Sequence, residues 1–385
     1  MRLKQAVILF LLGLLAGQLA SAETKPAKQI AVMLAHFQTK DAPGLAVLVL
    51  KDGKQVYAGG FGVEELRSKT SITPKTNFRI ASLTKQFTAA AILLLVHDGK
   101  LHLDDTLASV FPEFPPYGRN ITIRNLLNHT SGLQDYGPLM QKKYAGLPMD
   151  QIPQLHDKDV LALMEQQPGT IFPPGSQWEY SNAGYAVLAM VVERVSSMSF
   201  QSFLAQRIFK PLKMKRTVAF VKGENEVSDR AYGHSRAKDE WKETDQSPAS
   251  AILGDGGIYS SLEDLRKWND ALDHHRLLSV AEMEPEFTPV RLPNHAKPNL
   301  PDGSEADYGF GWFLRSYDGR DAQYHSGVTI GFKSAYWRFP QDHLAIIVLC
   351  NRMDIDPQGI TLDIADLFLL PEKSQPVPAQ PPTTK

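Results

Sequence analysis

The segment SLTKQFTAAAILLLVHDG, residues 82–99, decides how the rest of the chain is interpreted. Residues 84–97 predict a helix, and Gly99 is placed to end it. Ser82 and Lys85 stand at its start, and their spacing sets both side chains on one helical face, one turn apart. The start of a helix also directs backbone N–H groups and a positive dipole toward an approaching carbonyl group.

The Ser82–Lys85 pair is open to two interpretations. A serine hydroxyl is a poor nucleophile until a neighbouring base or cation activates it, so the pair fits a nucleophilic serine. The same tetrapeptide also fits a helix cap followed by a solvated lysine. The choice between them depends on what the remainder of the chain supplies.

Strand signals occur on both sides of this helix along the chain. Before it, residues 45–50 (LAVLVL) and 55–58 flank Asp52-Gly53, a pair that suits the tight turn of a hairpin. After it, further turn signals stand at Asp318-Gly319 and at residues 340–342. The strands predicted around these later turns are residues 308–316, 323–325, 332–339 and 344–349. A closing amphipathic helix is predicted at residues 360–369.

The middle of the chain carries mainly helical signals and loops rich in proline and glycine. Helices are predicted at residues 183–195 and 261–272, the second with Ser261 and Asp264 at the spacing of a capping box. Strands at both ends and helices between them predict an α+β fold, in which one antiparallel sheet is assembled from the two chain ends. The predicted units are a domain of residues 23–370, with a sheet lobe at about 40–80 and 290–370 and a helical lobe at about 85–285.

Composition limits the class of protein. The chain has 385 residues, 43% of them hydrophobic and 22% charged, which suits a soluble globular protein with a sizeable core. A formal net charge of -1 provides no overall field for nucleic acid or an acidic membrane. The single cysteine, Cys350, excludes an internal disulfide, and its apolar surroundings predict a buried small hydrophobe.

The two ends of the chain predict segments outside the folded domain. Residues 1–22 combine Arg2 and Lys4, an apolar run at 6–15 and a small-residue site, which is the order of a secretory signal peptide. Cleavage after about Ala22 would give a periplasmic or secreted protein with no stable membrane span. The alternative is an N-terminal membrane anchor, although the apolar run is short for one. Residues 371–385 (PEKSQPVPAQPPTTK) predict a disordered tail.

A second group of candidate residues is Tyr180-Ser181-Asn182, directly before the helix predicted at 183–195. A lysine ammonium close to a tyrosine hydroxyl favours the phenolate, which can act as a general base. The alternative is a buried tyrosine whose hydroxyl is merely hydrogen-bonded, with Asn182 capping the helix. Asn182 is able to fill both roles.

A third group, His325-Ser326-Gly327, stands at the end of a predicted strand. A small residue and a glycine there would let a substrate backbone lie close against the edge of the sheet. The alternative is a simple turn between two strands.

Taken together and in this order, the three groups resemble the serine β-lactamase and penicillin-binding protein superfamily, whose pattern is S-x-x-K, then Y-[SA]-N, then K/H-[ST]-G. Residues 126–133 (LLNHTSGL) and 256–261 (GGIYSS) also look like this family. The resemblance covers residues 40–370 approximately. It is greatest to class C β-lactamases, D-alanyl-D-alanine carboxypeptidases and related esterases and D-aminopeptidases.

The resemblance implies an acyl-transfer enzyme that needs no metal or organic cofactor. It places the nucleophile at Ser82, the helix lysine at Lys85 and the base at Tyr180. The implied substrate-binding residues are Asn182, His325, Ser326 and Gly327, and the implied oxyanion hole consists of the backbone N–H groups of Ser82 and Val328. Two such donors stabilise the developing oxyanion by several kcal/mol.

One departure from the family pattern bears on the substrate. His325 stands where class C β-lactamases typically carry lysine, and a histidine near pH 7 is only partly charged. This favours a D-amino-acid peptide as substrate, as in D-peptidases and carboxypeptidases. A class C-like β-lactamase or a small-ester esterase is the alternative within the enzyme class. A catalytically silent protein that binds peptidoglycan or antibiotics is the alternative outside it.

Overall fold

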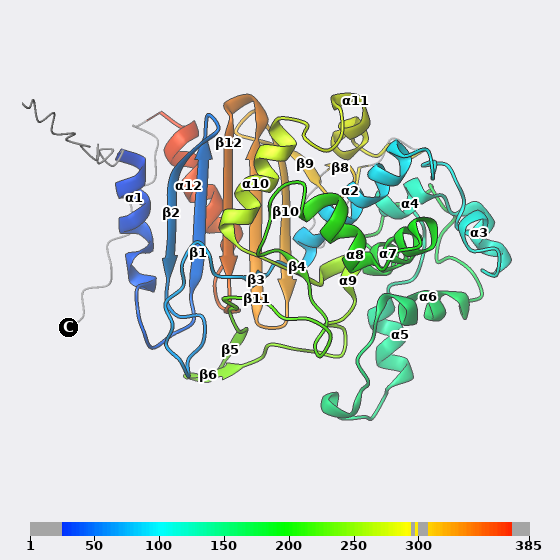
Figure 1. Cartoon of the computed structure of the whole chain (residues 1–385), viewed down its shortest axis with the longest axis horizontal. Helices are drawn as coiled ribbons and strands as arrows, with labels where there is room; N and C mark the ends of the chain where they lie inside the picture. Colours follow the sequence, from blue (N-terminus) through cyan, green and yellow to red (C-terminus); the bar gives the residue numbers. More distant parts are fainter. Residues whose placement is uncertain (1–24, 294–296, 299–306, 372–385) are drawn as a thin grey trace, which may run out of the picture.

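A large antiparallel sheet organises the molecule (Figure 1). The computed structural model describes residues 25–293, 297–298 and 307–371, so the predicted signal peptide and the predicted tail beyond Pro371 lie outside the described residues. Within this part of the chain, seven strands pair in the order β2-β1-β12-β11-β10-β9-β8. Their bounds are β1 Leu45–Lys51, β2 Lys54–Phe61, β8 Asp307–Tyr308, β9 Phe313–Tyr317, β10 Arg320–Thr329, β11 Phe332–Phe339 and β12 Leu344–Cys350. Because β1 pairs with β12, the two chain ends meet in one sheet, which confirms the predicted α+β class.

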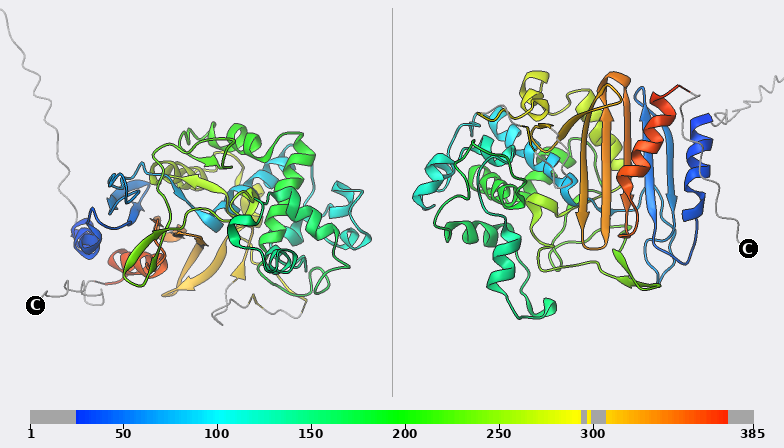
Figure 2. Two further views of the ribbon diagram at one scale, coloured as in Figure 1. Left: turned by 90° about the horizontal axis from the view of Figure 1, so that it is seen from below. Right: turned by 180° about the vertical axis from the view of Figure 1, so that it is seen from behind.

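Both faces of the sheet are covered. Helices α1 (Lys25–Leu34) and α12 (Pro357–Leu369) lie on one face (Figure 2), and α10 (Leu262–Asp273) packs against β1 and β12 on the other. Side chains of β1 alternate between the two cores, with Leu45 on the α1 side and Ala46 on the α10 side. Since neither face of β1 meets water over residues 45–50, this strand is apolar throughout instead of alternating with polar residues.

The remainder of the molecule is mainly a group of helices that lies beside the sheet (Figure 1). Helix α2 (Thr84–His97) is at their centre and packs against α7 (Asn182–Ser196) and α9 (Leu253–Gly256). The other helices of this region are α3 (Leu107–Val110), α4 (Ile123–Leu127), α5 (Tyr136–Lys143), α6 (Asp157–Glu165), α8 (Phe200–Leu204) and α11 (Val280–Met283). The smaller sheets are β3-β7-β4 (Phe78–Arg79, Ile258–Ser260, Val218–Ala219) and the hairpin β5-β6 (His234–Ala237, Glu240–Glu243).

Several predicted elements are confirmed in detail. The helix from Thr84 to His97 has the predicted bounds. Asp52 and Gly53 adopt φ angles of 52° and 71°, which the tight turn between β1 and β2 requires. Cys350 is fully buried at the end of β12. No helix in the described ranges has the length and apolar character needed to cross a membrane.

Two local predictions were wrong. The strand predicted at 308–316 is interrupted, because Gly311 turns the chain at φ 79° where a Cβ atom would lie 2.9 Å from the carbonyl oxygen of Lys85. The capping box at α10 is half formed. Ser261 accepts the Asp264 N–H, but the Asp264 carboxylate accepts backbone N–H groups of residues 216 and 217 instead of closing the box.

Candidate active site

Ser82 lies on a short 3-10 turn, Ala81–Leu83, between β3 and α2. Ala81 adopts a left-handed φ of 50°, so the chain bends sharply just before the serine. Ala81 and Leu83 are buried, whereas Ser82 is half-buried and lines a cavity of about 520 Å³. The turn therefore presents the serine hydroxyl to the cavity.

Lys85 is fully buried and connects three helices. Its Nζ donates to Ser82 Oγ at 3.2 Å, to Asn182 Oδ1 at 2.8 Å and to the Asp255 carbonyl oxygen at 3.0 Å. Three acceptors match the three N–H bonds of an ammonium group. The interpretation of Lys85 as a solvated lysine is therefore wrong, and the sequence-predicted pair is in contact.

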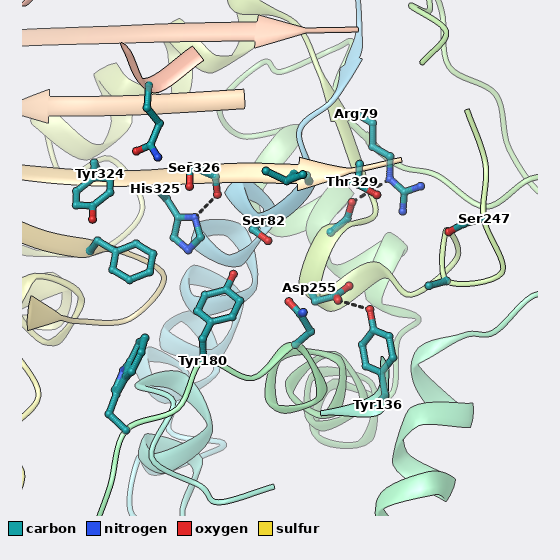
Figure 3. Close-up of a pocket in the computed structure, with 18 of the residues that line it drawn as sticks. Arg79, Ser82, Tyr136, Tyr180, Ser247, Asp255, Tyr324, His325, Ser326 and Thr329 are labelled. Atoms are coloured by element: carbon teal, nitrogen blue, oxygen red, sulfur yellow. Dashed lines mark hydrogen bonds between the residues drawn. The ribbon is translucent and has the colours of Figure 1, made fainter. Parts of the chain in front are cut away.

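Tyr180 stands beside this lysine. Its ring centroid is 4.9 Å from Lys85 Nζ and 4.4 Å from the ring centroid of His129, and its ring stacks at 9° on Phe313. Figure 3 shows the hydroxyl pointing between Ser82 and His325. It makes no hydrogen bond within the described residues. The alternative of a buried, hydrogen-bonded tyrosine hydroxyl does not hold, because Tyr180 is half-buried and its hydroxyl faces the cavity.

Asn182 contacts the lysine and does not cap helix α7. Its side-chain oxygen accepts from Lys85, and its Nδ2 donates to Asp135 Oδ2 at 3.3 Å. The N-cap is Ser181, whose Oγ accepts the Gly184 N–H at 3.1 Å. Capping needs an acceptor oxygen one residue before the helix, and Asn182 is already its first residue.

The segment that carries Tyr180 is fixed by His129, from the LLNHTSGL segment. The Ser181 N–H donates to His129 Nδ1 at 3.2 Å, and the Glu179 N–H donates to the His129 carbonyl oxygen at 3.0 Å. Burial, together with the charge of Lys85, holds the pKa of His129 well below its usual value. His129 is therefore neutral, and its ring contacts the ring of Tyr180, whose hydroxyl faces the cavity.

The triplet His325-Ser326-Gly327 lies inside β10 and not at its end. On one side β10 pairs with β11 through residues 323–329, but on the other side it pairs with β9 only through residues 320–324. From His325 onward, that second edge has no strand partner in the described residues and Ser326 faces the cavity. The alternative of a simple turn is wrong, and an extended substrate has a free strand edge to lie against.

Gly327 brings β10 close to the turn that carries Ser82. A Cβ atom on Gly327 would lie 2.5 Å from the Ile80 carbonyl oxygen and 2.4 Å from Ser334 Oγ. The predicted reason for the glycine, close approach of a substrate, stays a prediction, and the structure adds a second reason. This second reason is the close approach of the serine turn itself, which sets the spacing between the backbones of Ser82 and Val328.

His325 is buried and neutral. Its Nδ1 lies 2.6 Å from the Ser326 carbonyl oxygen, and its Nε2 lies 3.4 Å from the Tyr308 hydroxyl. Burial, followed by the nearby charge of Lys85, lowers the pKa of His325 to about 3. The expectation of a partly charged histidine is wrong, because the ring is only 1% exposed.

The cavity has two chemically different ends (Figure 3). Beyond Tyr180 and His325 its walls are mainly aromatic, with Trp178, Phe313 and Tyr324. On the other side of Ser82 the walls are polar, with Arg79, Tyr136, Ser247, Asp255 and Thr329.

The lining residues at these two ends were not predicted. Arg79 had a signal in the sequence, since it is a charged residue between the apolar Phe78 and Ile80, three positions before Ser82. Asp255 directly precedes the GGIYSS segment that resembles the family. The other residues come from loops and strands that only the fold brings to the site.

The site combines a half-buried serine, a buried lysine that donates a hydrogen bond to it, and a tyrosine whose ring lies beside the lysine. This arrangement defines a serine hydrolase of the β-lactamase and DD-peptidase type. The sequence matches the Beta-lactamase family over residues 30–369, and the chain belongs to this family. The predicted resemblance is confirmed.

Relatives in the family include penicillin-binding proteins and D-aminopeptidases. The chain is 34% identical to penicillin-binding protein 4* of Bacillus subtilis, over 80% of this chain and 67% of that protein. It is 29% identical to a D-aminopeptidase of Brucella anthropi, over 80% of this chain but only 56% of that enzyme's length. A penicillin-binding protein of Bacillus halodurans has a crystal structure that matches with a TM-score of 0.73 at 27% identity, over 88% of this chain and 99% of that one.

Proposed function

We propose that this serine hydrolase cleaves an amide bond of a D-amino-acid peptide through an acyl-enzyme on Ser82. The observation that carries the proposal is the buried Lys85 ammonium, which donates to both Ser82 Oγ and Asn182 Oδ1 at the wall of the cavity. The names of the relatives, a penicillin-binding protein and a D-aminopeptidase, support a D-amino-acid substrate.

The proposed mechanism uses only groups of this chain. Lys85 already donates three hydrogen bonds as an ammonium, so Tyr180, acting as a phenolate beside it, takes the proton from Ser82 Oγ and becomes a neutral phenol. Lys85 stabilises the charge on Oγ as it attacks the carbonyl carbon. The backbone N–H groups of Ser82 and Val328 stabilise the oxyanion. Tyr180 then gives its proton to the leaving amine, and water hydrolyses the acyl-enzyme.

Substrate contacts are proposed for the cavity edge of β10 and for Asn182. The peptide lies as an extended strand along His325, Ser326 and Gly327, where β10 has no described partner strand. Asn182 Nδ2 contacts a substrate amide oxygen. His325 positions the Tyr308 hydroxyl and the Ser326 backbone, and it supplies no charge.

The neutral state of His325 favours some of the candidate substrates over others. A β-lactamase of class C type uses a cation at this position for the substrate carboxylate, and burial removes that charge here. Peptide hydrolysis is therefore the first candidate. Hydrolysis of small esters remains the second, because the aromatic end of the cavity suits a neutral leaving group.

Export is a separate proposal. The order of Arg2, Lys4 and the apolar run at 6–15 supports a signal peptide cleaved after about Ala22, which would place the enzyme in the periplasm or outside the cell. Determination of the mature N-terminus from a secreting host tests it. An N-terminus at Met1 in the membrane fraction would support the anchor instead.

Intact-mass spectrometry tests the nucleophile. The protein is treated with a fluorophosphonate and with a penicillin, and Ser82→Ala is the control. We expect one adduct that is absent from the variant, and the variant should lose activity by at least about a thousandfold. Full hydrolytic activity of Ser82→Ala would contradict the proposal. The absence of an adduct with either reagent would favour the alternative of a catalytically silent protein that binds peptidoglycan or antibiotics.

Turnover of a D-alanyl-D-alanine peptide, nitrocefin and a p-nitrophenyl ester then ranks the substrates. We expect the peptide to be turned over with the highest kcat/KM. A long-lived penicillin adduct would agree with a peptidase, whereas rapid loss of the adduct with efficient nitrocefin turnover would instead assign a β-lactamase.

A further inference from the structure

Arg79 is a buried cation in the wall of the active-site cavity (Figure 3). It is only 4% exposed, and its guanidinium donates to Ser250 Oγ at 2.6 Å, the Ser250 carbonyl oxygen at 2.9 Å and the Gly256 carbonyl oxygen at 3.2 Å. These bonds use three of its five N–H groups, and all three acceptors are neutral. Within the described ranges, Arg79 forms no ion pair with a carboxylate.

A buried charge is costly unless an opposite charge compensates it. The hydrogen bonds to Ser250 and Gly256 explain how Arg79 ties β3 to the segment before β7, but they supply no negative charge. Burial raises the pKa of the nearby Asp255, and the charges of Lys85 and Arg79 oppose that rise, but Asp255 makes no direct ion pair with Arg79 in the described residues. Two N–H groups remain for another partner, and the side chain borders the cavity. An anion in the cavity would supply the missing charge.

The other charges at the cavity also favour an anion. Asp255 is the single carboxylate among the described lining residues, and it accepts the Tyr136 hydroxyl at 2.7 Å. Against it stand Arg79, the exposed Arg315 at the aromatic end, and Lys85 directly behind Ser82. Asp135, whose carboxylate accepts from Asn182, is a second acid next to the site. Even with both acids ionised, the three cations leave the site with one net positive charge, which attracts anionic substrates.

The proposed reaction decides which half of the substrate meets Arg79. Tyr180 gives its proton to the leaving group, so the leaving group lies on the Tyr180 and His325 side of Ser82. Figure 3 shows Arg79 and Asp255 on the opposite side of Ser82. The half of the substrate that becomes the acyl-enzyme therefore extends toward Arg79.

We propose that Arg79 binds a carboxylate carried by the acyl half of the substrate, and that the enzyme therefore prefers D-amino-acid amides with an anionic acyl half. This inference rests on the proposed function, because the acyl half is defined by the Ser82 acyl-enzyme. The hydroxyls of Ser247 and Thr329 line the same end and can add donors. A free ammonium group there would be repelled by Arg79, so unacylated D-amino-acid amides are poorer substrates.

Matched substrates that differ only in one charge test the inference. One pair is the p-nitroanilides of N-acetyl-D-glutamate and N-acetyl-D-glutamine, and the other is the p-nitroanilides of N-succinyl- and N-succinamoyl-D-alanine. The leaving group is constant, so the ratio of kcat/KM, acid over amide, reports the acyl half alone. We expect a ratio of about ten or more in at least one pair, as for a charge-assisted hydrogen bond.

Variants assign the preference to Arg79. In Arg79→Gln the acid-over-amide ratio of kcat/KM should fall to near one. In Arg79→Lys, which keeps the charge, the ratio should lie between one and the wild-type value. Arg315→Gln neutralises the cation at the opposite end of the cavity and should keep the wild-type ratio. Because the ratio is taken within each variant, a partly unfolded preparation lowers both rates equally and leaves the ratio unaffected.

Failure of this inference differs from failure of the proposed function. If Ser82 reacts with the fluorophosphonate but the wild-type ratio is near one in both pairs, Arg79 does not bind a substrate carboxylate. An equal fall of the ratio in Arg79→Gln and Arg315→Gln would also overturn it, since the preference would then come from the overall field. If Ser82 does not react, the proposed function itself fails. Protection of Ser82 against the fluorophosphonate by N-acetyl-D-glutamate α-amide, compared with the D-glutamine analogue, gives the same comparison without turnover.

Discussion

Tyr180 is held in place by its ring, while its hydroxyl is left to the cavity. The ring packs between His129 and Phe313, and the described residues offer the hydroxyl no hydrogen bond. Tyr180→Phe should therefore fold with nearly unchanged stability. It should lose about 10²- to 10⁴-fold in kcat/KM, the range for removal of a general base. Steady-state kinetics and a thermal melt check both parts.

The control for this prediction is Tyr324→Phe, which removes a phenol hydroxyl from another wall of the same cavity. It should lose far less activity than Tyr180→Phe. Equal losses in the two variants would mean that Tyr180 acts through general hydroxyl contacts with the substrate and not as the base.

Individual residues of the site could be predicted to the extent that short motifs carry them. Ser82, Lys85 and Asn182 stand in compact patterns, and they are in contact in the structure. Arg79 and Asp255 come from a two-residue strand and a four-residue helix, and no motif marked them. The charge of His325 was predicted wrongly, because its state depends on burial by Tyr308 and Phe313 from a neighbouring part of the sheet.

Helix α9 shows how a short element is fixed by a residue far from it in the chain. Asp157, at the start of α6, accepts the N–H groups of Leu253 at 2.8 Å and Gly254 at 2.9 Å. Burial raises the pKa of Asp157 to about 8, although these two hydrogen bonds favour its ionised form. The contact sets the position of the Asp255 carbonyl oxygen that accepts from Lys85. Such a contact has no local sequence signal.

Strand β10 lies in direct contact with the turn that carries Ser82, and a substitution at Gly327 tests how far the site depends on this contact. In Gly327→Ala the new methyl group would meet the Ile80 carbonyl oxygen and Ser334 Oγ, so β10 must move away from the turn. The backbone N–H groups of Ser82 and Val328, which form the proposed oxyanion hole, would then be moved apart. We expect kcat to fall by about 10²- to 10³-fold, the loss typical of one oxyanion donor. Single-turnover kinetics with a p-nitrophenyl ester measure it.

The double variant Gly327→Ala/Ser334→Ala is the control. It removes the hydroxyl but leaves the Ile80 carbonyl oxygen, 2.5 Å from the added Cβ, so activity should return only in part. Full recovery would show that the side chain of Ser334, and not the backbone of the turn, limits the approach.

Across the whole molecule, the hydrophobic pattern of the strands and the topology of the sheet were more predictable than the places where one element contacts another. The run at 45–50 and the hairpin turns predicted a sheet from both chain ends, and the pairing of β1 with β12 bears this out. The interruption at Gly311 was not predictable, because it follows from contact with the α2 backbone. The division into a sheet lobe and a helical lobe stays a prediction, and α10, assigned to the helical lobe, packs on the sheet.

The stability of the whole fold should depend on a buried acid behind the active-site helix. Glu286 is 2% exposed, and one of its carboxylate oxygens has no hydrogen-bond partner in the part of the chain that the structure describes. Burial raises its pKa to about 8 despite the opposing charge of Arg338. Between the ordinary carboxyl value of 4.5 and 8, the folded state keeps the proton that the unfolded state releases. The contribution of Glu286 to stability is therefore complete below that ordinary value and is lost as the pH rises toward 8.

Glu286→Gln removes this titration while keeping the shape of the side chain. The free energy of unfolding of the variant minus that of the wild type should increase by about 3 kcal/mol from pH 5 to pH 8, because only the wild type loses stability as the pH rises. The cost of burying the new amide is the same at both pH values and cancels. Urea denaturation at the two pH values measures the shift, and Glu284→Gln, at an exposed acid in the same turn, should follow the wild type. A constant difference between Glu286→Gln and wild type would mean that Glu286 is ionised in the fold, with its charge balanced by Arg338.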